Sequence, residues 1–495
     1  MKKTYIFCIA LFLMLGLASC SKKDYMTVIP ADATFVAQIN LADLAEQADL
    51  QNAPVIRTLK GYVGLIASGE EKEMVKAVLD DPSIIGVDFA APAYVFETID
   101  HHWGLVLCVK DNDHLDETFK VLAKQQIAAK PTERDGLMWT SLLDDINIAY
   151  DNQRLLILTA HSESAAPNAL KRQMSQLFEQ DKDLSFFETD KMLKLESTDA
   201  PISIYSRMAA LPQDMVQQMT GFLPKGVRSA DVEVCISADF REGNAVLRAT
   251  MFSDNEKIQQ LFEQADENMY KIQGDYLGAA SDHSFAWISV GCQGEWLHNL
   301  LKQSEQAKQA LFMLERGIDI EQMLRSIDGD VTFVLPSEPA AEGFAKTDFI
   351  AMATVKNSDF LSDVADWQRS ARDYGITLSE KGKNQYLLKA QDMQMEWGVD
   401  GETLYFTTPN AVLQKAFSQN GSLLSAYKDE IKDSQFFALV NMQALPSPNM
   451  NKIPLNAIVM KSERTGEVEI RLEGKTPSRS LLAQMLDMFA GLMNL

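Results

Sequence analysis

The feature that most constrains this fold is an internal repeat, because short patterns from the first half of the chain recur in the same order in the second half. An alternating strand pattern begins at Phe35 and recurs at Phe285. The further matches are Val109–Asn112 with Val355–Ser358, the hairpin around Asp151-Asn152 with that around Asp400-Gly401, Pro167–Ala169 with Pro409–Ala411, Met208–Pro212 with Met442–Pro446, and the turn Arg241–Asn244 with Thr465–Glu467. Ordered self-similarity of this kind indicates a duplicated structural unit. We therefore predict two tandem related modules.

Each module combines strand pairs with amphipathic helices. Alternating strands are joined by short turns such as Asp151-Asn152 and Asp400-Gly401, whose residue types tolerate positive φ. Leu115, Phe119 and Leu122 then recur at helical spacing. This order predicts an α+β fold in which each module is a mainly antiparallel sheet with packed helices. We place the modules at residues 20–282 and 283–495.

The first 19 residues have the organisation of a secretory signal peptide. Lys2 and Lys3 precede an apolar run from Tyr5 to Leu15, and small residues precede Cys20. The run is shorter than the ~20 apolar residues that span a bilayer. The segment Leu17–Cys20 resembles the lipobox of bacterial lipoproteins, in which the cysteine is diacylated and becomes the first mature residue. The resemblance implies a membrane partner reached through acyl chains on Cys20.

The residues after Cys20 indicate in which membrane of the cell envelope the protein would be anchored. By the rule of the lipoprotein family, Asp at the second mature position retains a protein in the inner membrane, and this chain has Ser21 there. Surface-exported lipoproteins usually carry an acidic cluster, whereas Lys22 and Lys23 come first here and Asp24 stands alone. We expect an outer-membrane protein of the cell envelope that faces the periplasm, with the leaflet and surface exposure left open.

Composition narrows the range of partners. The chain has 495 residues with 46% hydrophobic and 23% charged, which is ordinary for a folded protein of several domains. Its formal net charge of −23 repels phosphate backbones, so nucleic acid is excluded as a partner. Apart from this exclusion, the acidic composition bears on the solubility and association of the protein and gives no information about its fold.

Three cysteines remain after Cys8 leaves with the leader and Cys20 is acylated. Cys108 and Cys235 lie in strand-like segments, where cysteine usually behaves as a small buried hydrophobe, and Cys292 is the third. An odd number cannot all pair, so at most one disulfide is open to them. None has Cys-x-x-Cys spacing, and no metal or redox role is expected.

Two motifs resemble metal ligands but have simpler interpretations. Asp111–Glu117 is rich in oxygen ligands but lacks the turn glycine and spaced Glu of a calcium loop. We interpret it as a helix N-terminus, where acidic residues complement the helix dipole. His101-His102 is expected to be a polar turn between strands, because adjacent strand residues point to opposite faces and chelate poorly.

The paired carboxylates Asp144-Asp145 and Asp328–Asp330 are the best candidates for acid–base chemistry. Both are expected at hairpin or strand-entry turns, where such residues are common. No nucleophile-elbow or phosphate-loop motif occurs. The Met-rich final segment Ser480–Leu495 predicts an apolar helix, most often core, here packed on the sheet of the second module, with partner binding as the alternative. No catalytic, metal-binding or cofactor-binding residue is assigned.

The segment Val28–Ala33, the lipobox and the two-copy layout together resemble a family of Bacteroidota lipoproteins of unknown function, whose members open with Ile/Val-Pro-x-Asp-Ala. That family has no assigned activity, so the resemblance implies no catalytic residues and no cofactor.

Two functions remain open at this stage. The first is a non-enzymatic binding or structural scaffold, lipid-anchored in the envelope, with a peptide, glycan or protein partner. The alternative is a periplasmic hydrolase with a carboxylate-based site between the two modules. A cleft with convergent carboxylates would favour the hydrolase.

Overall fold

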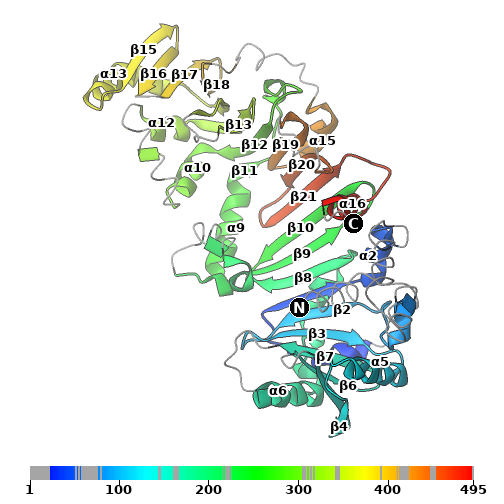
Figure 1. Ribbon diagram of the computed structural model, residues 1–495. Coiled ribbons are helices and arrows are strands. Elements are labelled where there is room, and N and C mark those ends of the chain that lie inside the picture. The colour runs from blue at the N-terminus through cyan, green and yellow to red at the C-terminus, as the bar shows by residue number, and fades with distance from the viewer. Residues whose placement is uncertain are drawn as a thin grey trace. The chain divides into compact units, whose positions relative to one another are not determined.

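The computed structural model describes residues 23–50, 53, 56, 76–78, 81–142, 146–159, 167–213, 216–217, 223, 226–303, 308, 311–312, 315, 318–340, 346–390, 393–409, 411, 423–445 and 453–492. The chain forms two compact units, each assembled from segments that are distant in sequence (Figure 1). Unit 1 contains the described residues up to Leu211 together with Glu233–Ala249 and Thr476 onward, and unit 2 contains Pro212–Val232 and Thr250–Lys475. The independence of 20–282 and 283–495 as folding units stays a prediction.

Unit 1 is built on an antiparallel sheet. Its strands are β1 (Phe35–Ile39), β2 (Ala93–Glu97), β3 (Trp103–Cys108), β4 (Thr132–Arg134), β5 (Leu137–Leu142), β6 (Ile146–Tyr150), β7 (Arg154–Thr159), β8 (Ile202–Arg207), β9 (Glu233–Asp239) and β10 (Asn244–Phe252), of which β10 belongs to unit 1 up to Ala249. They pair in the order β4-β5-β6-β7-β3-β2-β1-β8-β9-β10.

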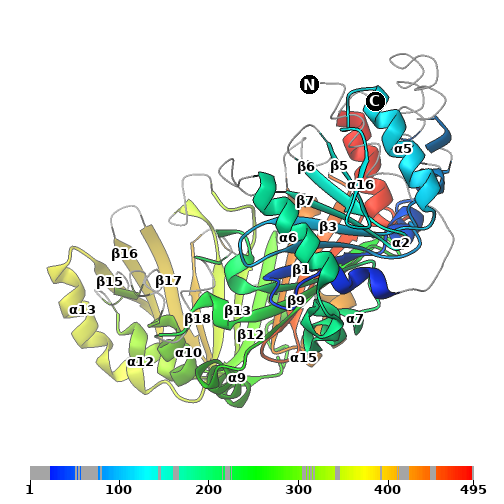
Figure 2. The same ribbon diagram turned by 90° about the horizontal axis from the view of Figure 1, so that it is seen from below.

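Helices cover this sheet on its faces. They are α2 (Leu41–Gln47), α5 (Asn112–Lys124), α6 (Pro167–Glu179), α7 (Asp190–Glu196) and α16 (Leu481–Leu492), with 3-10 turns η1 (Lys23–Val28), η3 (Pro82–Ile85), η4 (Lys182–Leu184), η5 (Phe186–Glu188) and η6 (Met208–Ala210). The predicted apolar stripe of α5, which includes Leu115 and Phe119, packs on Ile148 and Tyr150 of β6. Helix α6 packs against β6, β7 and η1, and Figure 2 shows it lying across strands of the same sheet.

Unit 2 contains a second antiparallel sheet. Its strands are β11 (Met269–Tyr270), β12 (Ala286–Gln293), β13 (Ile327–Leu335), β14 (Ile350–Val355), β15 (Thr377–Gly382), β16 (Gln385–Ala390), β17 (Met393–Asp400), β18 (Thr403–Thr407), β19 (Phe436–Asn441), β20 (Leu455–Ser462) and β21 (Glu467–Gly474). The main order is β15-β16-β17-β18-β14-β13-β12-β19-β20-β21, and β11 pairs with the end of β12. Strand for strand, this is the order found in unit 1.

The sheet of unit 2 carries a hydrophobic core on each face, although β15 and β16 expose alternate residues. The elements around it are α9 (Glu256–Asn268), α10 (Gly294–Leu301), α12 (Ile320–Arg325), α13 (Val364–Asp373) and α15 (Lys428–Asp433), with η7 (Ser229–Asp231), η8 (Leu277–Ala279), η10 (Asp359–Asp363), η11 (Ser425–Tyr427) and η12 (Met442–Ala444). One core joins α12 and α13 to Trp397 and Leu404. The other places Trp287, Phe437 and Tyr405 on the opposite face, since Leu404 and Tyr405 are adjacent strand residues.

These elements confirm the predicted α+β class with mainly antiparallel sheets. The final helix is a correction, because α16 belongs to unit 1 and not to the second module's sheet. The hydroxyl of Ser480, just before α16, donates to the backbone carbonyl of Gln47 at the end of α2. An apolar stripe identifies a face that is buried but not the surface that buries it. Among the described residues, no helix is both long and apolar enough to cross a bilayer.

Candidate functional site

The acidic segment Asp111–Glu117 begins helix α5, as predicted. The Asp111 carboxylate caps the helix by accepting from the His114 backbone N–H at 3.0 Å. That bond is the main reason the pKa of Asp111 lies below its ordinary value. The segment is therefore a helix cap.

The two histidines lie in the turn between β2 and β3, also as predicted. His101 has a positive φ of 61°, and its Nδ1 lies 2.9 Å from Glu97 Oε1. His102 Nδ1 lies 2.7 Å from Gln173 Oε1 on α6. The rings contact different partners, so they do not converge on one ligand. Within the described ranges, no group of three or more His, Cys, Asp or Glu residues could hold a metal ion.

The predicted turn at Asp328–Asp330 is wrong, because β13 already begins at Ile327 and the register with β14 shifts between Ile327 and Val331. Asp330 is buried, and its carboxylate accepts three backbone N–H bonds, from Gln273, Gly274 and Asp275 at 2.9, 2.8 and 3.3 Å. Burial raises the pKa of Asp330, and these N–H bonds oppose that rise. The carboxylate therefore holds the loop before β12 in place.

Replacing Asp330 by alanine should destabilise the protein by about 3 kcal/mol, because three backbone donors lose their buried acceptor. Asp328→Ala is the matched control, since Asp328 receives only an exposed 3.3 Å bond from Tyr270. Urea unfolding followed by circular dichroism measures both. Equal midpoints for the two variants would show that the loop does not depend on Asp330.

Cys108, Cys235 and Cys292 are all among the described residues, and none is disulfide-bonded. Cys108 and Cys292 are buried, and Cys235 is partly buried. Burial raises the pKa of Cys235 to about 11 and that of Cys292 to about 12. Both thiols are thus poorly ionised at neutral pH. The lipidation candidate Cys20 and the pair Asp144-Asp145 lie outside the described residues.

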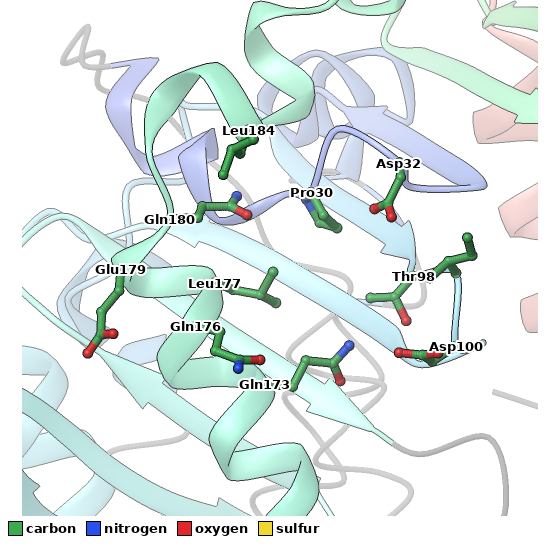
Figure 3. A pocket seen from close by; sticks show the side chains of 11 residues that line it. Pro30, Asp32, Thr98, Asp100, Gln173, Gln176, Leu177, Glu179, Gln180 and Leu184 are labelled. Carbon is green, nitrogen blue, oxygen red and sulfur yellow. The ribbon is translucent and has the colours of Figure 1, made fainter.

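One surface hollow is a groove in unit 1, at the end of the sheet where β1 begins, β2 ends and β3 begins. We call this the leading end; its register partners are Phe35, Glu97 and Trp103. The groove has a volume of about 450 Å³ and is open to solvent. Figure 3 shows α6 along one side and the loops before β1 and after β2 on the other. It is lined by the amides Gln173, Gln176 and Gln180, the carboxylates Asp32, Asp100 and Glu179, the apolar Pro30, Ile99, Leu177 and Leu184, and Thr98.

Several contacts fix the walls of this groove. Gln180 Nε2, at the end of α6, donates to the backbone carbonyls of Thr27 and Ile29. The Ala31 N–H donates to the Leu184 carbonyl at 2.9 Å, and Pro30 forms an isolated β-bridge with Ser185. The segment that leads into β1 is thus attached to the segment that follows α6. Gln173 is held by His102.

All the charged side chains that line the groove are negative. Three carboxylates line it, and no Lys, Arg or His is among its described lining residues. Two lysines near the groove pair with acids outside its lining. Lys182 lies 2.7 Å from Asp24, and Lys191 lies 3.9 Å from Glu233 and interacts electrostatically with Asp32. Burial lowers the pKa of Lys191. The groove therefore presents hydrogen-bonding amides and net negative charge, without a nucleophile beside a base.

A second polar hollow of about 430 Å³ lies at the opposite end of β1, lined by Asn40, Asp43, Glu196 and their neighbours. Asn40 is engaged there as the cap of α2, accepting from the Asp43 N–H. The walls of this hollow are the N-terminus of α2 and the C-terminus of α7.

Comparison with protein families gives one match, which covers residues 25–462 and is described as a domain of unknown function, DUF4836. The chain belongs to this family. The DUF4836 chain has no significant match among curated proteins. Two solved structures titled as crystal forms I and III of TP0453 align with TM-scores of 0.26 and 0.27 and identities of 10% and 12%. Each alignment covers 51% of this chain, and 87% and 91% of the respective TP0453 chains.

Sequence reasoning missed the groove of this DUF4836 protein. Its residues come from four separate segments, none of which carries a recognisable motif. The signals that were present are Pro30 and Asp32, in the segment that carries the family resemblance, and three glutamines, two within α6 and one directly after it. Gln173, Gln176 and Gln180 recur at helical spacing and so share one face, but a glutamine stripe is also typical of a solvated surface.

Proposed function

We propose that this DUF4836 protein is a lipid-anchored, non-enzymatic protein of the cell envelope that binds a partner through the groove. Support for the anchor comes from the leader and from Leu17–Cys20, whose cysteine would carry the acyl chains. Ser21 supports the outer membrane, and the basic Lys22-Lys23 supports a periplasm-facing position.

We also propose that the chain arose by internal duplication. The support is the shared strand order of the two sheets, in which β1–β10 correspond in turn to β12–β21. The 3-10 turns η6 and η12 follow β8 and β19 and coincide with the repeated Met-x-Ala-Leu-Pro pattern. Gene duplication explains this agreement more simply than independent origin of the same topology.

The ligand that fits this groove best is a basic peptide segment. The observation that supports this choice is that all the charged residues in the lining are acidic. Asp32 and Asp100 lie on adjoining loops and would attract a Lys or Arg side chain. Gln173 Oε1 and Gln180 Nε2 are engaged within the protein, and the other amide atoms of the three glutamines include both donors and acceptors that could match a peptide backbone. Glycan sites commonly use an aromatic platform, and no aromatic residue is among the described lining of this groove.

A hydrolase is less well supported. Its strongest described carboxylate pair is Asp328–Asp330, where Asp330 is occupied by three backbone amides. The groove itself combines carboxylates with amides and lacks a serine, cysteine or lysine nucleophile in its lining.

The double variant Asp32→Asn/Asp100→Asn tests the binding proposal. Calorimetric titration with a capped Gly-Lys-Leu-Lys-Gly peptide should give binding that weakens about tenfold in the variant, because charge-assisted hydrogen bonds are lost. Binding should also weaken as salt rises. Asp135→Asn is the control, since Asp135 is exposed, lies outside the groove and has a positive φ that Asn tolerates.

The peptide with Glu in place of both Lys residues should not bind. Equal affinity for the Lys and Glu peptides, or equal weakening by Asp135→Asn, would refute the groove as a site for basic peptides.

A further inference from the structure

The turn between β2 and β3 places two histidines beside the groove. The residues that precede them in this turn, Thr98, Ile99 and Asp100, line the groove. The second histidine reaches the other wall, because His102 Nδ1 lies 2.7 Å from Oε1 of Gln173 on α6, which also lines the groove. Figure 3 shows the side chains of Gln173 and Asp100, which come from these two walls. His102 therefore connects the turn to α6 at the groove.

The hydrogen-bond partners of the two histidines determine where each ring takes up a second proton. A carbonyl or carboxylate oxygen accepts, so His102 Nδ1 donates to Gln173 Oε1, and His101 Nδ1 donates to Glu97 Oε1 at 2.9 Å. Each neutral ring therefore has its lone pair on Nε2, and the second proton binds there. Protonation keeps both hydrogen bonds and adds one positive charge to each ring.

The two added charges have different surroundings. The carboxylate of Glu97 is buried, accepts from the Thr34 hydroxyl at 2.7 Å and lies 2.9 Å from His101, so it would balance a positive charge on that ring. The side chain that accepts from His102 is instead the neutral amide of Gln173. A positive charge on His102 would therefore act on the groove itself.

The other charged groups around His102 do not offset that charge change. Among the described residues they are Asp100 and His101 in the turn, Glu97 at the end of β2, Asp32 before β1, and Lys171, Arg172 and Glu179 on α6. Lys171 and Arg172 lie two positions and one position before Gln173, so they do not share its face of α6. Protonation of His102 thus adds positive charge beside carboxylates that line the groove.

We propose that His102 makes the groove sensitive to pH, so that a basic peptide is held when His102 is neutral and released when it is protonated. The inference rests on the proposed binding of a basic peptide and adds the regulation of that site. An imidazolium near Asp100 repels the Lys or Arg side chain of the ligand and competes for the same carboxylate. Histidine ordinarily titrates near pH ~6.5, so affinity should fall between about pH 8 and about pH 5.5.

Calorimetric titration of the full chain with the capped Gly-Lys-Leu-Lys-Gly peptide, at low salt and at both pH values, tests this regulation. The affinity of the unsubstituted protein should be about fivefold weaker at the lower pH. His102→Asn stays neutral, and its amide nitrogen can take the place of Nδ1, so this variant should lose most of the pH dependence. His102→Arg stays charged and should bind weakly at both pH values.

His114→Gln is the matched control. His114 is an exposed histidine on α5 that pairs with Asp111 and is not among the lining residues of the groove. The change in affinity between the two pH values should therefore match that of the unsubstituted protein. Circular dichroism at both pH values checks the folding of every variant. An NMR titration of the His102 ring in the unsubstituted protein tests the same step without any substitution.

The possible outcomes separate this inference from the proposed function. Equal affinities of the unsubstituted protein at the two pH values would overturn the inference and leave the basic-peptide site standing. An undiminished pH dependence in His102→Asn would overturn it too, by assigning the effect to other groups, as would a His102 ring signal that does not change over this pH range. Absence of binding at about pH 8 would instead overturn the proposed function.

Discussion

Cys20→Ser should release the protein from the membrane fraction into the soluble fraction. Acyl chains contribute roughly 0.8 kcal/mol for each buried CH₂, and several chains make anchoring stable where a single one is marginal. Serine offers no thiol for thioether formation, so no acyl chains would be attached at this site. The measurement is immunoblotting of carbonate-washed membranes.

Substitutions at the next position serve as the control for the anchor. Ser21→Asp should keep the acyl chains but shift the protein from the outer to the inner membrane, following the lipoprotein sorting rule. Ser21→Ala should leave both anchoring and location unchanged. Cys20→Ser protein that stays in washed membranes would contradict the lipid anchor.

Trp397→Ala should be the most destabilising single substitution within unit 2, at about 4 kcal/mol. Trp397 is fully buried, and its ring centroid lies 4.6 Å from Tyr386, 5.9 Å from Trp367 and 6.2 Å from Phe406. Alanine would leave a cavity that joins β16, β18 and α13. The rigid sheet around it can close only part of that space, and the aromatic contacts are lost as well.

Two further variants isolate the cause of that loss. Trp397→Phe should recover much of the stability, because it keeps an aromatic ring and removes an indole N–H that has no hydrogen-bond partner among the described residues. Trp139→Ala is the control, since Trp139 in β5 is only partly buried and bonds the Arg134 carbonyl at 3.3 Å. Hydrogen exchange across β16–β18 and urea unfolding measure the effects. Similar losses from Trp397→Ala and Trp139→Ala would contradict the role of the aromatic cluster.

Elements set by local chemistry could be predicted with accurate bounds. The hairpin β17–β18 was expected from Asp400-Gly401, and Gly401 has the positive φ of 60° that the turn requires. Asp111 was expected at a helix start, and it accepts the backbone N–H of the third residue of its helix. In these cases the interacting groups are neighbours in the chain, so residue type alone decides the outcome.

Elements that depend on distant partners were predicted less well. Asp330 has the residue type of a turn, yet its three donors come from a loop more than fifty residues away, and they hold it within β13. The helix α16 has the apolar stripe of a core helix, but its contact with Gln47 joins the two ends of the chain. A local sequence pattern does not specify which distant surface a residue such as Asp330 or a helix such as α16 will pack against.

The sequence by itself determined the α+β class, the repeated order of strands and helices, the caps, and the lipobox-like leader, because periodicity, turn chemistry and capping act over a few residues. Only the tertiary structure decided the groove. The pairing of Phe35 with Glu97 brings Asp32 and Asp100 together across more than sixty residues, and Gln180 then fixes α6 beside them. The leading end exists for the same reason, because the register between β2 and β3 places Ile99, just after β2, close to Trp103 at the start of β3.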